Sequence, residues 1–478
     1  MTHRILTAIC LLALVPGGLS AQRIFRAGAA TSNITPPVGA PTVGGWTPQP
    51  SKYIHDELHV RCLVLDDGQT RLALSVSDNL GIPRYVYDEA KRALQQKTGL
   101  PMTHILMSST HTHSGPSSRA NGHITGGGEP LDEYQRFLAV KLADCVQNAI
   151  HNLEPARVGW GAGSEPGQVF NRRWKLKPGK HAVNPFGGID TAVMNPGGNP
   201  DIHEPAGPVD PEVAFLSVQS ASGRPIALLA NYSLHYVGGV GPNHISADYF
   251  GMFAGRIRQM LGADGQDPPF VGILSNGTSG DVNNNDYSPN RKTPSRRYEP
   301  YEKMRMIANI VAAEVYRVYQ TTPHHDWVPL RMLEREIPMG VRVPTAEQVA
   351  WAKEVLARPA GAAAKHQREE NYAHRIMRMS TWPAEIPYIV QALRIGDLAI
   401  VGLPNEVFAE TGLEIKKRSP FPRTFTISLA NGGYIYLPTP EQHKLGGYET
   451  WIGSSLFEVE ATTKIMKTLV EMFDGLKR

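Results

Sequence analysis

A chain of 478 residues is long enough to bury a large hydrophobic core, in one elaborated domain or in several smaller ones. Hydrophobic residues make up 41% of the sequence and charged residues 19%, which excludes a disordered or fibrous protein. The formal net charge of +4 is small and no basic run with interleaved aromatic residues is present, so nucleic acid is not an expected partner.

The first 21 residues have the pattern of a secretory signal peptide. Arg4 precedes an apolar run that ends at Val15, a Pro-Gly-Gly break follows, and Leu19-Ser-Ala21 offers a small-residue cleavage site. We therefore expect a mature chain of residues 22–478 that is secreted or periplasmic. The apolar run is too short to span a bilayer and no later stretch is long enough, so no transmembrane segment is expected in the mature chain.

Two cysteines, Cys62 and Cys145, belong to that mature chain, since Cys10 lies within the signal. In an oxidising compartment they can form one disulfide, or they can remain buried thiols, and both alternatives stay open. They do not form the closely spaced pair that is typical of a metal site.

Strand and helix patterns alternate in the N-terminal part of the mature chain. Residues 60–65 and 71–76 predict two strands joined by the turn Asp66-Asp67-Gly68, and residues 88–98 predict an amphipathic helix that ends at Gly99. A short apolar strand at residues 105–107 follows. This order indicates an α/β arrangement of layers.

Two histidines follow this short strand in the run Met107-Ser-Ser-Thr-His-Thr-His-Ser-Gly-Pro116. On an extended backbone, residues two apart point to the same face, so the imidazoles of His111 and His113 are expected side by side. Such a pair at a strand end suits a metal site. The alternative is a pair of hydrogen-bonded structural histidines.

The rest of the chain repeats the pattern of strands that end in polar residues. We expect a hairpin at residues 213–218 and 225–232 and helices at 131–153, 249–261, 300–319 and 407–417. Buried strands are expected at 270–274, at 395–401 with an interrupting turn at Gly396-Asp397, and at 424–430. Residues 345–380 predict a helical excursion on the surface. No linker or internal repeat divides the chain, so we predict one large α/β domain over residues 22–478, with a mixed β-sheet core flanked by helices.

The polar residues at the ends of the apolar runs form a candidate site. They are His111, His113, His235, Asp248, Asp281, Glu406 and Tyr436. Side chains from separate strand ends can converge at one edge of a sheet. Two imidazoles with a carboxylate suit zinc and leave a position for water, which is the chemistry that amide or ester hydrolysis needs. A structural role for each single residue is the alternative.

The motifs also resemble, in order, those of the neutral/alkaline non-lysosomal ceramidases, zinc-dependent amidases that release fatty acid from ceramide. The resemblance is to their catalytic domain and runs along almost the whole mature chain. Its motifs are Asn33-Ile-Thr-Pro-Pro-Val-Gly39, Ser109-Thr-His-Thr-His-Ser-Gly-Pro116, Asn231-Tyr-Ser-Leu-His235 with the later Asp248, Gly280-Asp-Val282, Pro404-Asn-Glu406, and Tyr436-Leu-Pro-Thr-Pro-Glu441 with Gly447-Tyr-Glu449. The string Thr-His-Thr-His-Ser-Gly-Pro is the specific one.

Carried over residue by residue, the resemblance implies four zinc ligands: His111, His235, Glu406 and Tyr436. It implies that His113 hydrogen-bonds the reacting water or the substrate, and that Tyr448 stabilises a tetrahedral oxyanion. Arg172 matches an arginine that lines the family's site, where it would hold the substrate together with Asn283.

Two features depart from the ceramidase pattern. Ceramidases have Gly-Asp-Val-Ser-Pro-Asn at the substrate cleft, where this chain has Gly280-Asp-Val-Asn283-Asn-Asn285. Asparagine has no nucleophilic hydroxyl, so a serine acyl-enzyme route at this position is excluded, whereas a zinc–water route does not need that serine. The chain also stops soon after Tyr448, and we expect no C-terminal immunoglobulin-like domain of the kind that full ceramidases have.

The leading hypothesis is an exported, Zn²⁺-dependent hydrolase that cleaves an amide (N-acyl) bond of a small-molecule or lipid-like substrate. A zinc esterase or deacetylase that acts on a sugar or another small polar substrate is one alternative. A non-catalytic metal-binding homologue is the other.

Overall fold

Two packed β-sheets form the centre of the protein in the computed structural model, which describes residues 23–116, 118, 130–289, 291, 296–359 and 361–477. The predicted signal peptide lies outside the described residues. Across the larger sheet the strands are β19 (Val271–Asn276), β17 (Pro225–Tyr232), β16 (Glu212–Ser220), β9 (Glu154–Ser164), β1 (Arg26–Asn33), β5 (His59–Asp66), β6 (Arg71–Ser77) and β7 (Ile105–Ser109).

This larger sheet is mixed, as predicted. Its edge pairs β17–β19 and β6–β7 are parallel, whereas β16–β17 and β5–β6 are the two antiparallel hairpins expected from the sequence. The turn between β5 and β6 is held by Asp67, whose Oδ1 accepts the backbone N–H groups of Gln69 and Thr70 at 2.8 and 2.7 Å. Aspartate is favoured in turns because its side chain can make such local bonds.

The smaller sheet has the strand order β21 (Leu330–Gly340), β22 (Glu385–Ile395), β23 (Leu398–Gly402) and β25 (Arg423–Ile427). The turn predicted at Gly396-Asp397 is present, and it joins two antiparallel strands, since Ile395 of β22 pairs with Leu398 of β23. Gly396 has φ +59°, a left-handed conformation that allows the tight turn between them. The long strands β21 and β22 were not predicted.

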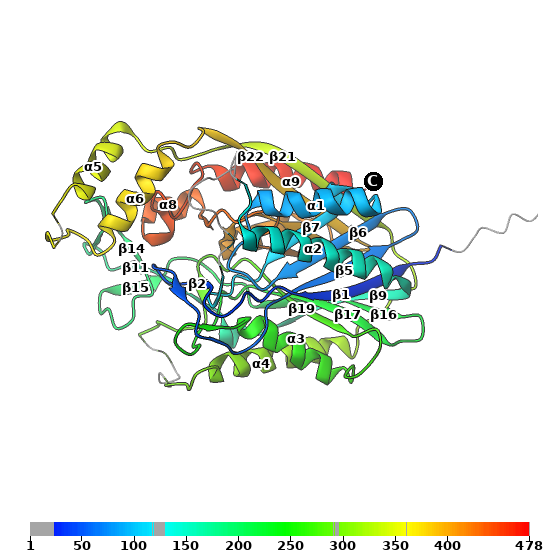
Figure 1. Ribbon diagram of the computed structural model, residues 1–478. Coiled ribbons are helices and arrows are strands. Elements are labelled where there is room, and N and C mark those ends of the chain that lie inside the picture. Colours follow the sequence, from blue (N-terminus) through cyan, green and yellow to red (C-terminus); the bar gives the residue numbers. More distant parts are fainter. Residues whose placement is uncertain are drawn as a thin grey trace, which may run out of the picture.

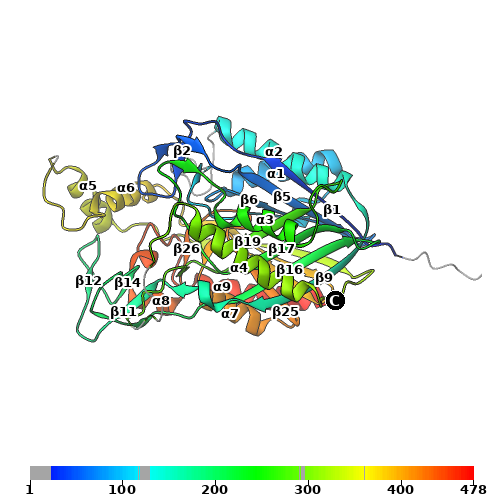
Figure 2. The same ribbon diagram turned by 90° about the horizontal axis from the view of Figure 1, so that it is seen from below.

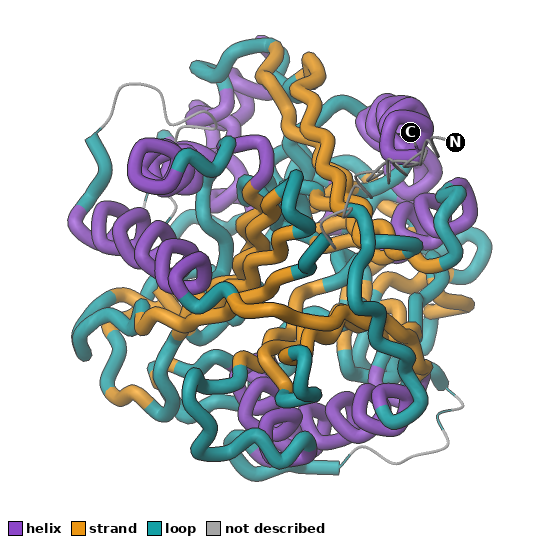
Figure 3. The backbone as a smooth tube through the Cα atoms, turned by 90° about the vertical axis from the view of Figure 1, so that its right-hand side faces the viewer, coloured by secondary structure: helices purple, strands orange, loops and turns teal. Residues whose placement is uncertain are grey.

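Helices cover the outer faces of both sheets, which gives a four-layer α/β architecture (Figures 1 and 3). Helices α1 (Arg84–Thr98), α2 (Glu133–His151), α3 (Asp248–Met260) and α4 (Glu302–Tyr319) pack on the larger sheet, and α7 (Ala409–Arg418) and α9 (Ala461–Lys477) on the smaller one. Successive side chains of β5 point to opposite faces of the larger sheet, so this strand contributes to the core on both sides. Leu63 and Leu65 face the smaller sheet, whereas Cys62 and Val64 face α1 and α2. Cys62 and Cys145 are buried, free thiols.

The excursion at residues 345–380 contains α5 (Ala346–Leu356) and α6 (Glu369–Met379), which extend away from the sheets in Figures 1 and 2. Helix α6 is not wholly solvated, because it buries Tyr372, Ala373 and Ile376 against neighbouring segments. Within the described residues, no helix is both long and apolar enough to cross a membrane.

Short strands connect these layers around the carboxyl ends of β7, β17 and β23. They are β2 (Pro41–Val43), β3 (Gln49–Pro50), β4 (Tyr53–Ile54), β8 (Gly115–Pro116), β10 (Phe170–Asn171), β11 (Arg173–Leu176), β12 (Ala182–Val183), β13 (Ile189–Asp190), β14 (Ala192–Met194), β15 (Ile202–Pro205), β18 (His244–Ile245), β20 (Val282–Asn283), β24 (Glu406–Val407) and β26 (Tyr436–Leu437). A short helix, α8 (Pro440–Leu445), follows β26.

Candidate metal centre

The two edges of the larger sheet approach each other at their carboxyl ends. Strands β7 and β19 lie at opposite edges, yet the side chain of Asn276, the last residue of β19, donates to the Thr110 carbonyl just beyond β7 at 3.2 Å. The smaller sheet reaches the same place, because the backbone N–H of Ser428, after β25, donates to the Asn276 carbonyl at 3.0 Å. Residues that follow strands of both sheets are thereby brought together.

His111 comes from the segment after β7, but not from an extended strand. The strand ends at Ser109 and His111 has φ +72°, so the prediction that its imidazole and that of His113 share one face of a strand was wrong. The left-handed conformation is held by a backbone bond from His111 N–H to the Asn79 carbonyl at 3.0 Å. Such a conformation costs a residue with a Cβ free energy on the order of 1 kcal/mol, so the surrounding bonds must fix it.

Each of three imidazoles has its Nδ1 directed at a backbone carbonyl oxygen. His111 Nδ1 lies 2.6 Å from the oxygen of Leu80, His113 Nδ1 lies 3.0 Å from that of Gly44, and His235 Nδ1 lies 2.9 Å from that of Ser279. Carbonyl oxygens only accept hydrogen bonds, so each Nδ1 carries the proton. In the neutral ring, Nε2 is then left with a free lone pair.

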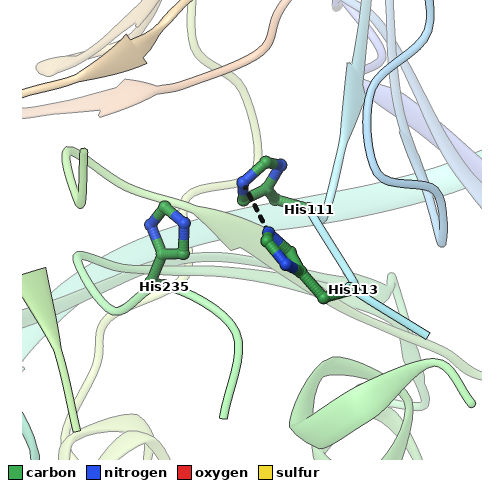
Figure 4. A group of neighbouring side chains, drawn as sticks. All are labelled: His111, His113 and His235. Carbon is green, nitrogen blue, oxygen red and sulfur yellow. Dashed lines mark hydrogen bonds between the residues drawn. The ribbon is translucent and has the colours of Figure 1, made fainter. Parts of the chain in front are cut away.

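These histidines converge, as Figure 4 shows. Their ligand nitrogens all lie within 4.8 Å of one another, and His111 Nε2 and His113 Nε2 are 3.1 Å apart. His235 is buried, follows β17 and has no hydrogen-bond partner at Nε2 within the described residues. The sequence-based expectation that His111, His113 and His235 lie together is confirmed.

Glu406 and Tyr436 join the cluster through a parallel pairing. They are the first residues of β24 and β26 and are direct partners in that pair. Glu406 Oε2 lies 3.3 Å from His111 Nε2 and 3.7 Å from His235 Nε2, and the Glu406 side chain is 5% exposed. Burial, and next the charge of Glu406, raise the pKa of Tyr436 well above its ordinary value, so its phenol is neutral.

The donor set fits a divalent cation. Burial, and then neighbouring His111, lower the pKa of His113 well below its ordinary value, and burial with Arg172 does the same for His235. The neutral rings of His113 and His235, with their protons on Nδ1, therefore direct Nε2 lone pairs toward the centre of the cluster, where the Glu406 carboxylate also lies. Zinc is held by such nitrogen and oxygen atoms at about 2.0–2.2 Å, which places tetrahedral ligands about 3.3–3.6 Å apart. Glu406 Oε2 lies at comparable distances from the two expected nitrogen ligands, 3.3 Å from His111 Nε2 and 3.7 Å from His235 Nε2.

Arg172 lies beside Tyr436 and is held by a buried carboxylate. Its guanidinium is 5.2 Å from the Tyr436 ring centre, and its Nε donates to Glu449 Oε1 at 3.0 Å. Arg173 donates to the other oxygen of Glu449 at 2.7 Å, and both Arg173 and Glu449 have fully buried side chains. Burial opposes the charge of Arg172, but Tyr436 and Glu449 outweigh it and raise the pKa of Arg172.

Tyr448 forms the more accessible side of the cluster. Its ring lies 5.5 Å from that of Tyr436, and it is half-buried, like His113. Burial raises the pKa of Tyr448, so its hydroxyl stays protonated and can donate a hydrogen bond. The buried groups are thus those expected to bind metal, and the half-buried ones those expected to meet water or substrate.

Asn283 lies in β20, which pairs with β10 next to Arg172. Its Nδ2 donates a hydrogen bond to Asn195 Oδ1 at 2.9 Å, so the structure places Asn283 among other polar loop residues and not in the histidine cluster.

Asp248 and Asp281, which were also candidates from the sequence, accept hydrogen bonds from backbone N–H groups instead. Asp248 accepts the N–H groups of residues 237 and 238, and Asp281 accepts that of Ala409.

Two contributors were missed in the sequence. Glu449 lies in a motif used for the resemblance, but nothing in the sequence indicates that it bonds two adjacent arginines. Gly44 supplies the carbonyl that orients His113, and a Cβ at this position would lie 2.0 Å from the His113 carbonyl oxygen. The Gly44-Gly45 pair beside Trp46 was the available signal for a close backbone approach.

Comparison with known proteins identifies relatives of this chain and of its fold. Residues 25–298 match the family model described as neutral/alkaline non-lysosomal ceramidase, N-terminal. Neutral ceramidase A of Dictyostelium discoideum is 25% identical over 294 residues, which cover 58% of this chain and 38% of that protein. The match therefore spans about two-fifths of the length of this curated relative.

Solved ceramidase structures have the same fold. A ceramidase complexed with C2 superposes with a TM-score of 0.70 at 16% identity, over 95% of this chain and 76% of the other. The neutral ceramidase from Pseudomonas aeruginosa gives a TM-score of 0.69 at 16% identity, over 95% of this chain and 75% of the other. The arrangement of the layers is thus shared over nearly the whole chain.

Proposed function

Because the chain belongs to the neutral/alkaline non-lysosomal ceramidase family, we propose that it is a zinc-dependent hydrolase that cleaves the amide bond of an N-acyl, lipid-like substrate. The observation that carries the proposal is the set of three imidazoles with converging Nε2 atoms beside the Glu406 carboxylate. His111, His235, Glu406 and Tyr436 are the proposed zinc ligands. When bound, zinc polarises a carbonyl group and lowers the pKa of water to about 7.

His113 is proposed as the general base and acid. Its bond to the Gly44 carbonyl fixes the proton on Nδ1, so Nε2 can accept a proton from the attacking water. The lowered pKa of His113 keeps the ring neutral and ready to do this at neutral pH. The same nitrogen can then deliver the proton to the leaving amine.

Tyr448 and Arg172 are proposed to act on the substrate carbonyl. A neutral Tyr448 hydroxyl donates a hydrogen bond to the oxygen that becomes negative in the tetrahedral intermediate. Arg172, held by Glu449, adds a fixed positive charge beside Tyr436. Arg172 and Asn283 are proposed to hold the substrate, since the pairing of β10 with β20 keeps their segments adjacent.

The substrate panel that tests this proposal uses purified, zinc-loaded protein with N-acyl and O-acyl compounds, including a fluorescent ceramide. We expect the wild type to hydrolyse N-acyl compounds. This activity should be lost when a chelator removes the zinc, and it should also be lost in His113→Gln. Folded protein that keeps full activity without metal would contradict the proposal.

Asn283 favours one second candidate, a zinc esterase or deacetylase of a small polar substrate. The ceramidase pattern has serine at this position, so the substrate contacts there differ. Turnover of O-acyl compounds without turnover of N-acyl compounds would select this candidate.

The N-terminal apolar run supports a further proposal, that the protein is exported to the periplasm or secreted. Mass spectrometry of the mature N-terminus can test this proposal.

A further inference from the structure

Helix α6 brings two arginines to an aromatic cluster beside the candidate site. The guanidinium of Arg368, the residue before α6, lies 3.6 Å from the ring centre of Trp46, and that of Arg375 lies 5.3 Å from it. Arg375 is also 5.0 Å from the ring centre of Tyr372. Both arginines are half-buried, so they belong to a packed cluster and remain accessible.

This cluster is continuous with the proposed catalytic groups. The ring of Trp46 lies 5.8 Å from that of Tyr448, which in turn lies 5.5 Å from that of Tyr436. Trp46 also follows closely on Gly44, whose carbonyl orients His113. A group bound at the two arginines would therefore lie next to the oxyanion donor.

Two of the nearby carboxylates, Glu369 and Glu449, are already paired with other cations. Glu369 accepts from Arg358 at 3.0 Å, and Glu449 is bonded by the two arginines at positions 172 and 173. Among the residues that the structure describes, neither Arg368 nor Arg375 forms an ion pair. Burial lowers the pKa of Arg368, and the positive charge of Arg375 lowers it further. Two like charges gathered without a counter-ion are stabilised when an anion binds between them.

We propose that Arg368 and Arg375, stacked on Trp46, form a subsite for an anionic group that the substrate carries near its scissile amide. This inference rests on the proposed function. The chemical class is a carboxylate, sulfate or phosphate, because planar guanidinium groups bind these oxyanions through paired N–H donors. The preferred substrates are then charged N-acyl compounds rather than neutral ones.

The test compares N-dodecanoylglycine with N-dodecanoylglycinamide, which differ only by a carboxylate in place of a carboxamide. For the zinc-loaded wild type, kcat/KM should favour the carboxylate by about tenfold or more, the range expected of charge-assisted hydrogen bonds. In Arg368→Gln/Arg375→Gln the ratio should fall to near one, and Arg368→Lys/Arg375→Lys should retain part of it. The matched control is Arg378→Gln, an exposed arginine of the same helix, which should leave the ratio unchanged.

Calorimetric binding of N-dodecanoylglycine and of inorganic sulfate completes the test, with thermal melting to confirm that each variant folds. A wild-type ratio near one, or a ratio that the double glutamine variant keeps, overturns the proposal. Sulfate binding that depends on both arginines, together with a wild-type ratio near one, assigns the site to a free anion and also overturns it. If neither compound is hydrolysed, the proposed function fails, and loss of N-dodecanoylglycine binding in the double variant still decides the anion site.

Discussion

Replacement of Glu449 by glutamine should destabilise the protein strongly. Glu449 is the only carboxylate that the structure shows bonded to Arg172 and Arg173, at 3.0 and 2.7 Å, within the described residues. The Glu449 and Arg173 side chains are 0% exposed and that of Arg172 is 6% exposed. Removing one partner from a buried ion pair leaves the other charge uncompensated, which costs about 3–5 kcal/mol of unfolding free energy.

Glutamine has the same shape and keeps one oxygen, so no cavity accompanies the loss of charge. The substitution should also release Arg172 from its place beside Tyr436, and catalytic efficiency should fall with stability. Urea unfolding followed by circular dichroism measures the first effect, and N-acyl hydrolysis below the transition measures the second.

The matched control is Glu204→Gln, which breaks the exposed ion pair between Lys175 and Glu204 at 2.9 Å. Exposed pairs are screened by water and salt, so no measurable loss of stability is expected. An unfolding midpoint for Glu449→Gln that equals those of the wild type and of this control would refute the reasoning.

Two further outcomes follow from the structure. Burial raises the pKa of Asp281 from 3.8 to about 6, so the native state binds more protons than the unfolded state between these values, and stability falls as pH rises through them. Asp281→Asn should therefore gain about 3 kcal/mol relative to the wild type between about pH 4 and pH 7, measured by urea unfolding at each pH; equal pH slopes would contradict this. Gly44→Ala should lower kcat by about tenfold or more with zinc content unchanged, because a Cβ would displace the carbonyl that orients His113. Gly45→Ala, which meets no atom closer than 4.0 Å, is its control, and equal activities of the two variants would count against the role of Gly44.

The parts of the fold set by local chemistry could be predicted from the sequence. The β5–β6 and β16–β17 hairpins follow from turn residues between apolar runs, and both were found. The turn at Gly396-Asp397 was expected as well, but the long strand β22 that precedes it was not.

The convergence of His111, His235 and Glu406 was predicted from their positions after strands and from the resemblance. The physical basis of this convergence could not be predicted, because the approach of the two sheet edges depends on long-range hydrogen bonds such as that from Asn276 to the Thr110 carbonyl. The left-handed backbone of His111 has no signature in a sequence without glycine at that position. For the same reason the Glu449 ion pairs, which join segments far apart in the chain, could not be inferred.

Zinc content tests the central claim most directly, namely that His111, His235, Glu406 and Tyr436 form a zinc site. Purified wild-type protein, dialysed against metal-free buffer and analysed by mass spectrometry of its metals, should retain about one zinc per chain. His235→Ala should retain far less, whereas His181→Ala, a change to an exposed histidine outside the cluster, should bind zinc as the wild type does. Folded wild-type protein that neither retains nor takes up zinc would contradict the account.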